Sequence, residues 1–163
     1  GPFLLTELLL PLLEKAPEGR IINVSSLAHA YSPALDLSTI DECLKDFNAS
    51  TAYSKSKLAS VMHARELTRR FRARGNTTVT VNALHPGAVV TDLGRNLGLG
   101  YKISFVVLSL FLKSWKDGAQ TSLYCALSSE LKGVSGQYFA DCARKTEAPL
   151  ARDDLACKQL YDY

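Results

Sequence analysis

The sequence has few of the residues that mark a metal-binding or nucleic-acid-binding protein. Its four cysteines form no Cys-x-x-Cys pair and its three histidines lie far apart in the chain, so no metal site is predicted. The formal net charge is only +3, and no basic face is interleaved with aromatic residues, so no nucleic-acid partner is predicted. We infer reduced thiols in a protein that faces the cytosol and is not secreted.

Long hydrophobic runs and leader sequences are also lacking. No signal peptide opens the chain, and its most apolar block, residues 101–113, is too short to span a bilayer. Two interpretations of this block stay open, a buried or substrate-covering helix and a segment that lies on a membrane surface. The chain does not begin with Met, and its first residues resemble the inside of a helix, so we expect an upstream portion.

The composition, with 47% hydrophobic and 21% charged residues, is that of an ordinary globular protein with one core. A Leu-rich helix, expected to be buried on most sides, comes first, and a 24-residue polar excursion at 27–50 separates the first strand from the longest helix. The arginines late in that helix are interpreted as a solvated face. Helices are predicted at 3–13, 51–74, 117–130 and 153–161, and strands at 20–26, 77–84 and 137–140.

Strands that alternate with helices predict an α/β protein with right-handed crossovers in a parallel sheet. We therefore expect a single partial domain over 1–163, the second half of a Rossmann-like doubly wound fold with about three strands and flanking helices. Ligands of such sheets bind outside the carboxyl ends of the strands. Ser25 and Ser26 follow the first strand there, and the turn at 85–87 follows the second.

One pair of residues in the longest helix suggests acid/base chemistry. Tyr53 and Lys57 are four residues apart, so they share a helix face. A free phenol is a poor acid at neutral pH, and a fixed cation nearby favours its ionised form. The pair therefore predicts a proton-transfer device, although the spacing alone is a weak signal.

Taken together, these motifs resemble the short-chain dehydrogenases/reductases over essentially the whole chain. The matching segments are Asn-Val-Ser-Ser at 23–26, Tyr-x-x-x-Lys at 53–57 and Pro-Gly-x-x-x-Thr at 86–91. The wider stretches RIINVSSLAH at 20–29 and VNALHPGAVVTDL at 81–93 are similar to the retinol dehydrogenase branch.

The resemblance implies a role for each matching residue. Ser26, rather than Ser25, would hold the substrate oxygen, and Tyr53 would pass the proton. Lys57 would tune Tyr53 and bind the nicotinamide ribose. The remaining residues implied to line the cofactor are Pro86, Gly87, Val89 and Thr91.

The resemblance further implies an NAD(P)-dependent oxidoreductase that interconverts an apolar, retinoid-like alcohol and its aldehyde or ketone. NADP is expected, with NAD as the alternative. The family's glycine-rich phosphate turn and its catalytic Asn would lie upstream of Gly1. Membrane association through an upstream segment, a location in the cytoplasm or on the cytoplasmic face of the endoplasmic reticulum, and a homodimer paired through 3–13 and 51–74 are also implied.

Two other functions remain open at this stage. The chain would be a non-catalytic form that acts as a binding or interaction module if the fold is incomplete in life. The second alternative is an epimerase or dehydratase, a relative of the family that uses the same Tyr and Lys. Loss of turnover after a Tyr53→Phe substitution separates the first alternative from the enzyme, and net alcohol oxidation excludes the second.

Overall fold

The computed structural model describes residues 1–38, 48–89 and 113–163, and within them one sheet has the strand order β1-β2-β3-β4. Three strands are parallel, each within two residues of its expected bounds: β1 (Gly19–Val24), β2 (Val79–Leu84) and β3 (Tyr138–Ala140). The α/β class and the parallel sheet are therefore confirmed. β1 lies at one edge of this sheet, so among the described strands it pairs only with β2.

A fourth strand, β4 (Ala143–Lys145), runs antiparallel to β3 and was not predicted. Asp141 and Cys142 join the two strands with positive φ angles of 52° and 54°, the backbone geometry of a two-residue hairpin. Sequence reasoning missed this strand because Cys is not a usual turn residue and the exposed strand carries no apolar alternation.

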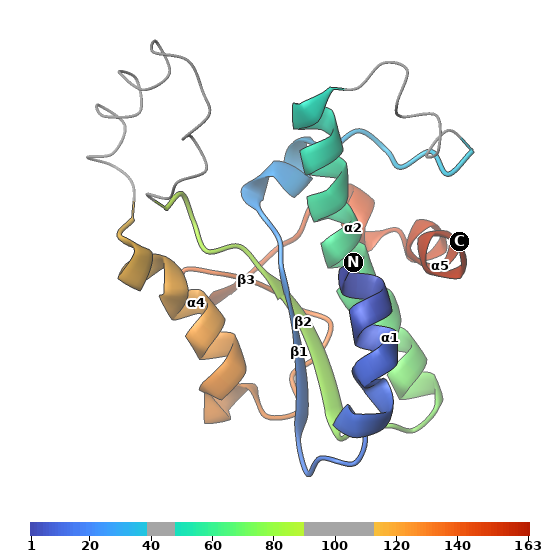
Figure 1. Ribbon diagram of the computed structural model, residues 1–163, viewed down its shortest axis with the longest axis vertical. Helices are drawn as coiled ribbons and strands as arrows, with labels where there is room; N and C mark the ends of the chain where they lie inside the picture. The colour runs from blue at the N-terminus through green and yellow to red at the C-terminus, as the bar shows by residue number, and fades with distance from the viewer. Residues whose placement is uncertain (39–47, 90–112) are drawn as a thin grey trace.

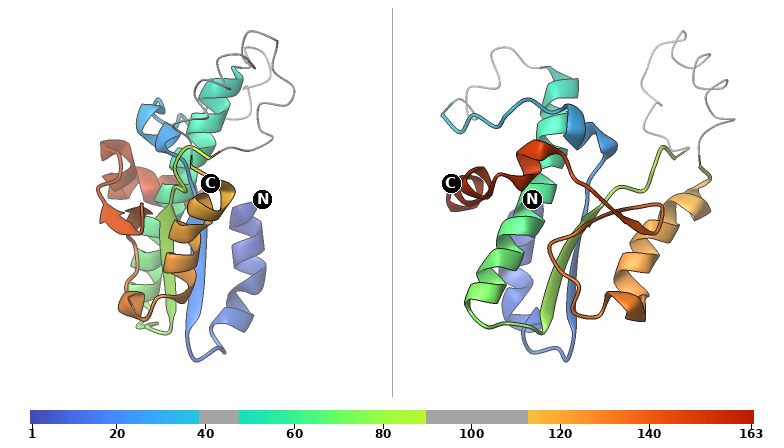
Figure 2. Two further views of the ribbon diagram at one scale, coloured as in Figure 1. Left: turned by 90° about the vertical axis from the view of Figure 1, so that its left-hand side faces the viewer. Right: turned by 180° about the vertical axis from the view of Figure 1, so that it is seen from behind.

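Helices cover both faces of the sheet, as a doubly wound fold requires (Figures 1 and 2). Helices α1 and α2 lie on one face, α5 packs against α2, and α4 lies on the opposite face. The helices are α1 (Pro2–Leu13), α2 (Ala49–Ala73), α4 (Trp115–Leu127) and α5 (Asp154–Asp162), with short 3-10 turns η1 (Leu27–Tyr31), η4 (Ser129–Leu131) and η5 (Pro149–Arg152).

The side chains of β2 alternate between two hydrophobic clusters. Val79, Val81 and Ala83 face α2 and belong to the larger cluster, whereas Leu84 joins Phe139 in a smaller one on the α4 side. All six residues of β2 are buried. The two polar ones, Thr80 and Asn82, donate hydrogen bonds to the Gly19 and Val134 carbonyls, as buried polar groups require. This central strand thus fixes the carboxyl edge of the sheet, where the predicted site residues lie.

Helix α1 corrects the prediction of burial on most sides. Only Thr6 and Leu10 are buried, and Leu4, Leu8 and Leu12 are exposed. Helix α1 packs on β1 along one side, and the described residues provide no second neighbour for the outer leucines. The outer leucines of α1 therefore form an exposed apolar surface on the described part of the protein. In the same described ranges no helix combines the length and apolar character needed to cross a membrane.

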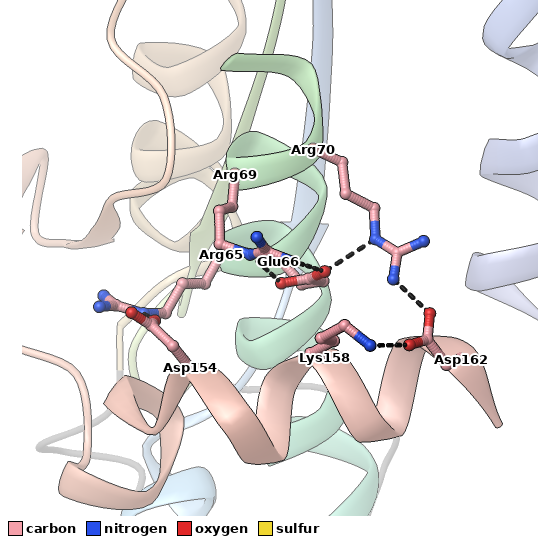
Figure 3. Close-up of polar contacts among 7 residues, drawn as sticks. All are labelled: Arg65, Glu66, Arg69, Arg70, Asp154, Lys158 and Asp162. Atoms are coloured by element: carbon pink, nitrogen blue, oxygen red, sulfur yellow. Dashed lines mark hydrogen bonds and ion pairs between the residues drawn. The ribbon is translucent and has the colours of Figure 1, made fainter. Parts of the chain in front are cut away.

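The arginines of α2 also differ from the predicted solvated face (Figure 3). Glu66 is only 1% exposed and accepts hydrogen bonds from Arg69 and Arg70. Arg70 also forms an ion pair with Asp162, and Arg65 forms one with Asp154, so these side chains join α2 to α5. A buried carboxylate needs cationic partners, and for that reason part of the basic face is drawn into ion pairs.

Candidate active site

The start of α2 decides where Tyr53 and Lys57 lie. Asn48 caps the helix, because its side-chain oxygen accepts a hydrogen bond from the Thr51 N–H at 2.9 Å. Helix α2 therefore begins at Ala49 rather than at residue 51, and Tyr53 occupies its second turn. One helical turn separates Tyr53 from Lys57, so the two side chains share one face, as predicted.

Lys57 interacts with both the tyrosine and the sheet. Its Nζ lies 5.5 Å from the centroid of the Tyr53 ring, within the range of a cation–π contact. It also donates a hydrogen bond to the Val24 carbonyl at 3.2 Å, at the carboxyl end of β1. Tyr53 is 43% exposed, so its phenol is open to a ligand while the ammonium is held beside it.

Ser25 fastens the end of β1 to α2. Its side chain is 3% exposed, and its Oγ donates to the Lys57 carbonyl at 2.7 Å. The N–H of Ser25 also pairs with the Leu84 carbonyl of β2. The hydroxyl proton of Ser25 is therefore used within the fold, and this side chain joins β1 to α2.

Ser26 leads from the strand into η1. Its Oγ accepts a hydrogen bond from the Ala28 N–H at 3.2 Å and so caps this 3-10 turn. Accepting that bond leaves the hydroxyl proton available for donation to a ligand oxygen. Hydrogen bonds in a chain polarise one another, so the Ala28 amide makes the Ser26 hydroxyl a better donor.

His29 lies directly behind Ser26 and was not singled out from the sequence. It is 2% exposed; its Nδ1 is 2.8 Å from the Ser26 carbonyl, and its Nε2 is 3.1 Å from the Ala148 nitrogen. Because the Ala148 N–H can only donate, Nε2 must accept and Nδ1 must carry the proton. The available signal was its place in a turn just after a strand.

The turn after β2 contains most of the predicted cofactor residues. The Gly87 N–H donates to His85 Nδ1 at 3.0 Å, and Gly87 has a φ of 89°, a conformation that favours glycine. A Cβ there would come within 3.1 Å of the Lys113 side chain. Pro86 is half-buried in the same turn.

Val89 extends this turn toward α4. It forms a parallel bridge with Lys113, and its side chain packs so closely on Gly118 that a Cβ on this glycine would approach within 2.5 Å. Lys113 also pairs with Asp141 of the β3–β4 hairpin. Thr91 lies outside the described residues, as does the apolar block at 101–113 apart from Lys113.

Three aromatic rings underlie this edge of the sheet. His29 and Tyr138 have ring centroids 4.7 Å apart, and Tyr138 stacks on His85 at 6.0 Å. Burial lowers the pKa of His85. The charge of Asp141 opposes this shift, whereas His29 and Lys113 also lower the pKa. Burial also raises the pKa of Tyr138, whose hydroxyl has no hydrogen-bond partner among the described residues. The row connects the Ser26 segment to the Gly87 turn.

The donors at this edge suit the hydroxyl groups of a ribose and the oxygen of an alcohol. They are the Lys57 ammonium, the Tyr53 phenol and the Ser26 hydroxyl, all around the carboxyl end of β1. Across the described parts of the chain, no cluster of three or more His, Cys, Asp or Glu side chains could hold a metal ion. The arrangement is fit for hydrogen bonding and proton transfer.

Comparison with known proteins gives relatives along the full chain, although no protein-family model matches it. Human retinol dehydrogenase 14 is 43% identical over 166 residues, which cover 99% of this chain and 48% of the relative. The chloroplastic short-chain dehydrogenase TIC 32 B of Brassica napus is 38% identical over 174 residues, covering 100% of this chain and 52% of the relative. The chain thus spans about half the length of the curated relatives it matches.

A solved structure shares the fold of this chain. A crystal structure of an uncharacterized protein from Mycobacterium paratuberculosis superposes with a TM-score of 0.66 at 26% sequence identity. The match covers 98% of this chain and 55% of that chain. Since both the sequence and the α/β fold agree, the chain belongs to the short-chain dehydrogenase/reductase family, in its retinol dehydrogenase-like branch.

Proposed function

We propose that the chain is part of an oxidoreductase that interconverts an apolar alcohol and its aldehyde or ketone. The supporting observation is the 2.7 Å hydrogen bond from Ser25 to the Lys57 carbonyl. It holds the Ser-Ser end of β1 against the turn of α2 that carries Tyr53 and Lys57, although these motifs are about 30 residues apart. The printed names of the relatives, which are retinol and short-chain dehydrogenases, agree with this proposal.

Tyr53 is the acid/base in the proposed reaction. In the oxidation direction, the ionised phenol accepts the proton of the alcohol, and in the reduction direction it returns the proton to the carbonyl oxygen. Lys57 holds its positive charge beside this phenol, with Nζ 5.5 Å from the ring centroid. The exposure of Tyr53 allows the substrate oxygen to reach the phenol.

Ser26 holds the substrate oxygen. Its hydroxyl oxygen already accepts a hydrogen bond from the Ala28 N–H, so its proton can be donated to a ligand. A donor fixed in this way stabilises negative charge on the substrate oxygen as it develops. Ser25 does not compete, because its proton is used by the Lys57 carbonyl.

A nicotinamide dinucleotide fits the donors on this edge, and we propose NADP, with NAD as the alternative. When bound, it would supply the hydride chemistry that no amino-acid side chain provides. Lys57 and Tyr53 would hold the ribose, and the turn with Gly87 at a φ of 89° would offer close approach to its backbone. The other residues proposed to line the cofactor are Pro86, Val89 and Thr91.

The proposal extends to the setting of the reaction. We propose a single partial domain over 1–163, a retinoid-like substrate, and a location in the cytoplasm or on the cytoplasmic face of the endoplasmic reticulum. A homodimer through α1 and α2 is also proposed. It is supported by the exposed leucines of α1, although α5 already packs against α2.

Replacement of Tyr53 by Phe tests the proposed function. The protein, produced from its complete coding sequence, is assayed for all-trans-retinol oxidation by chromatographic measurement of the retinal and the NADPH that form. Loss of the acid/base is expected to lower kcat/KM by about 100-fold or more. Tyr124→Phe, at the far end of α4 where the hydroxyl donates to Glu130, is the matched control and is expected to keep full activity.

Three other results would redirect the proposal. Equal turnover by the wild type and the Tyr53→Phe variant would remove Tyr53 from the reaction. Conversion of the alcohol without formation of NADPH would favour an epimerase or dehydratase. No turnover at all, together with a cellular effect that survives Tyr53→Phe, would favour a binding or interaction module.

A further inference from the structure

His29 is the best-anchored polar side chain of this edge that the proposed reaction does not use. It is 2% exposed, and it comes from η1, which directly follows Ser26. Both ring nitrogens have backbone partners, the Ser26 carbonyl at 2.8 Å and the Ala148 nitrogen at 3.1 Å. A buried ring with both nitrogens occupied cannot act on a substrate, so its effect must pass through the groups it holds.

The Ser26 peptide is held mainly by this histidine. The Ser26 carbonyl accepts the Nδ1–H of His29 and, at 3.1 Å, the backbone N–H of the same residue. Ser26 Oγ in turn accepts from Ala28. These three bonds fix the carbonyl and the hydroxyl of Ser26 relative to one short turn, which leaves little freedom for the hydroxyl to move.

The second ring nitrogen anchors this turn to a distant part of the chain. Ala148 is buried and directly precedes η5, which leads into α5. Helix α5 is itself tied to α2 by Asp154 and Asp162 (Figure 3), and α2 carries Tyr53. Through His29, the position of Ser26 is therefore tied to α5 and α2, and α2 also positions Tyr53.

We propose that His29 is a positioning residue that holds the Ser26 hydroxyl in place for the substrate oxygen. This inference rests on the oxidoreductase function proposed above. The fixed tautomer is essential to it, since only an Nδ1–H can donate to the Ser26 carbonyl while Nε2 accepts from Ala148. A shift of the hydroxyl by about 1 Å lowers catalysis strongly without any loss of cofactor contacts.

Three variants separate the two hydrogen bonds of the ring. In His29→Asn the amide nitrogen is bonded to Cγ, as Nδ1 of the imidazole is, so it is able to donate to the Ser26 carbonyl but not to reach Ala148. The longer His29→Gln side chain reaches the position of Nε2 and retains only the Ala148 bond. His29→Ala loses both bonds, and all three leave a space beside Tyr138.

The variants are produced from the complete coding sequence and measured in three ways. These are retinol oxidation with kcat and KM, melting temperature, and hydrogen exchange of the Ala28 amide. His29→Ala and His29→Gln are expected to lose about 10- to 100-fold in kcat, with an unchanged KM for NADP and faster Ala28 exchange. His29→Asn is expected to recover most of kcat and slow exchange, although its melting temperature falls with the others.

The outcomes distinguish this inference from the proposed function. If kcat follows the melting temperature across all variants, or if Gln restores kcat as well as Asn does, His29 has only a structural role and the inference is wrong. Turnover that depends on Tyr53 but not on His29 would leave the proposed function intact and overturn the inference alone. Absence of turnover in the wild type would remove both, even if Ala28 exchange responds as expected.

Discussion

Neutralising Glu66 is expected to loosen the attachment of α5 to α2. Glu66 is 1% exposed, and its two oxygens accept three hydrogen bonds of 2.7 Å from Arg69 and Arg70. Burial disfavours ionisation of this carboxyl, but the bonds from Arg69 and Arg70 outweigh burial and lower the pKa of Glu66. Glu66→Gln keeps the size of the side chain, removes the charge that strengthens all three bonds and replaces one accepting oxygen by an N–H₂ group.

The magnitude follows from these contacts. A hydrogen bond to a charged group contributes about 1.5–3 kcal/mol, and Gln turns an N–H₂ group toward one of the guanidinium donors. Arg69 is half-exposed and regains water, which offsets part of the loss. We expect a decrease of about 3 kcal/mol in the free energy of unfolding, or about 6–12 °C in melting temperature for a chain of this length.

The assay is urea denaturation of wild type and Glu66→Gln at pH 7, followed by circular dichroism, with Glu14→Gln as the control. Glu14 is an exposed glutamate that accepts from Asn76, so its replacement is expected to change stability by less than about 0.5 kcal/mol.

A second arm of the assay uses pH. Because the folded-state pKa of Glu66 is below its ordinary value of 4.5, the stabilisation is complete above pH 4.5 and is lost as the pH falls through the folded-state pKa. The difference between wild type and Glu66→Gln should therefore narrow in acid. A difference below about 1 kcal/mol at pH 7, or one that stays constant into strong acid, would refute the reasoning.

Two further predictions concern buried side chains. Burial lowers the pKa of His63 below its ordinary value of 6.5, with Glu7 in partial opposition; stability should therefore fall as the pH drops below 6.5, and urea titrations should show a weaker fall for His63→Gln. Equal pH slopes for the two proteins would contradict this. Burial also raises the pKa of the Cys125 and Cys157 thiols to about 11 and about 12. Mass spectrometry after iodoacetamide treatment at pH 8 should find both unmodified in the native protein and alkylated in urea, and native labelling of Cys157 at the denatured rate would count against it.

The sequence by itself determined the three parallel strands, the four helices α1, α2, α4 and α5, and their order. The alternation of apolar strands with amphipathic helices depends on local periodicity, which is written in consecutive residues, and so the parallel sheet was predictable. The Tyr53 and Lys57 pair was also predictable, because a spacing of four on a helix fixes a shared face whatever the surroundings. Membership of the family followed from motifs at the ends of two strands and on one helix.

The tertiary structure alone decided how the side chains around those motifs are used. Ser25 and Ser26 are chemically identical neighbours, and the resemblance to the family favoured Ser26. Only the tertiary structure gives the physical difference, since the Ser25 hydroxyl donates to the Lys57 carbonyl whereas Ser26 Oγ accepts from Ala28. The contact of His29 with Ala148 joins residues 119 positions apart, and no local pattern encodes such a pair. The exposed leucines of α1 have the same cause, since composition reports how apolar a helix is and only its neighbours determine how much of it is buried.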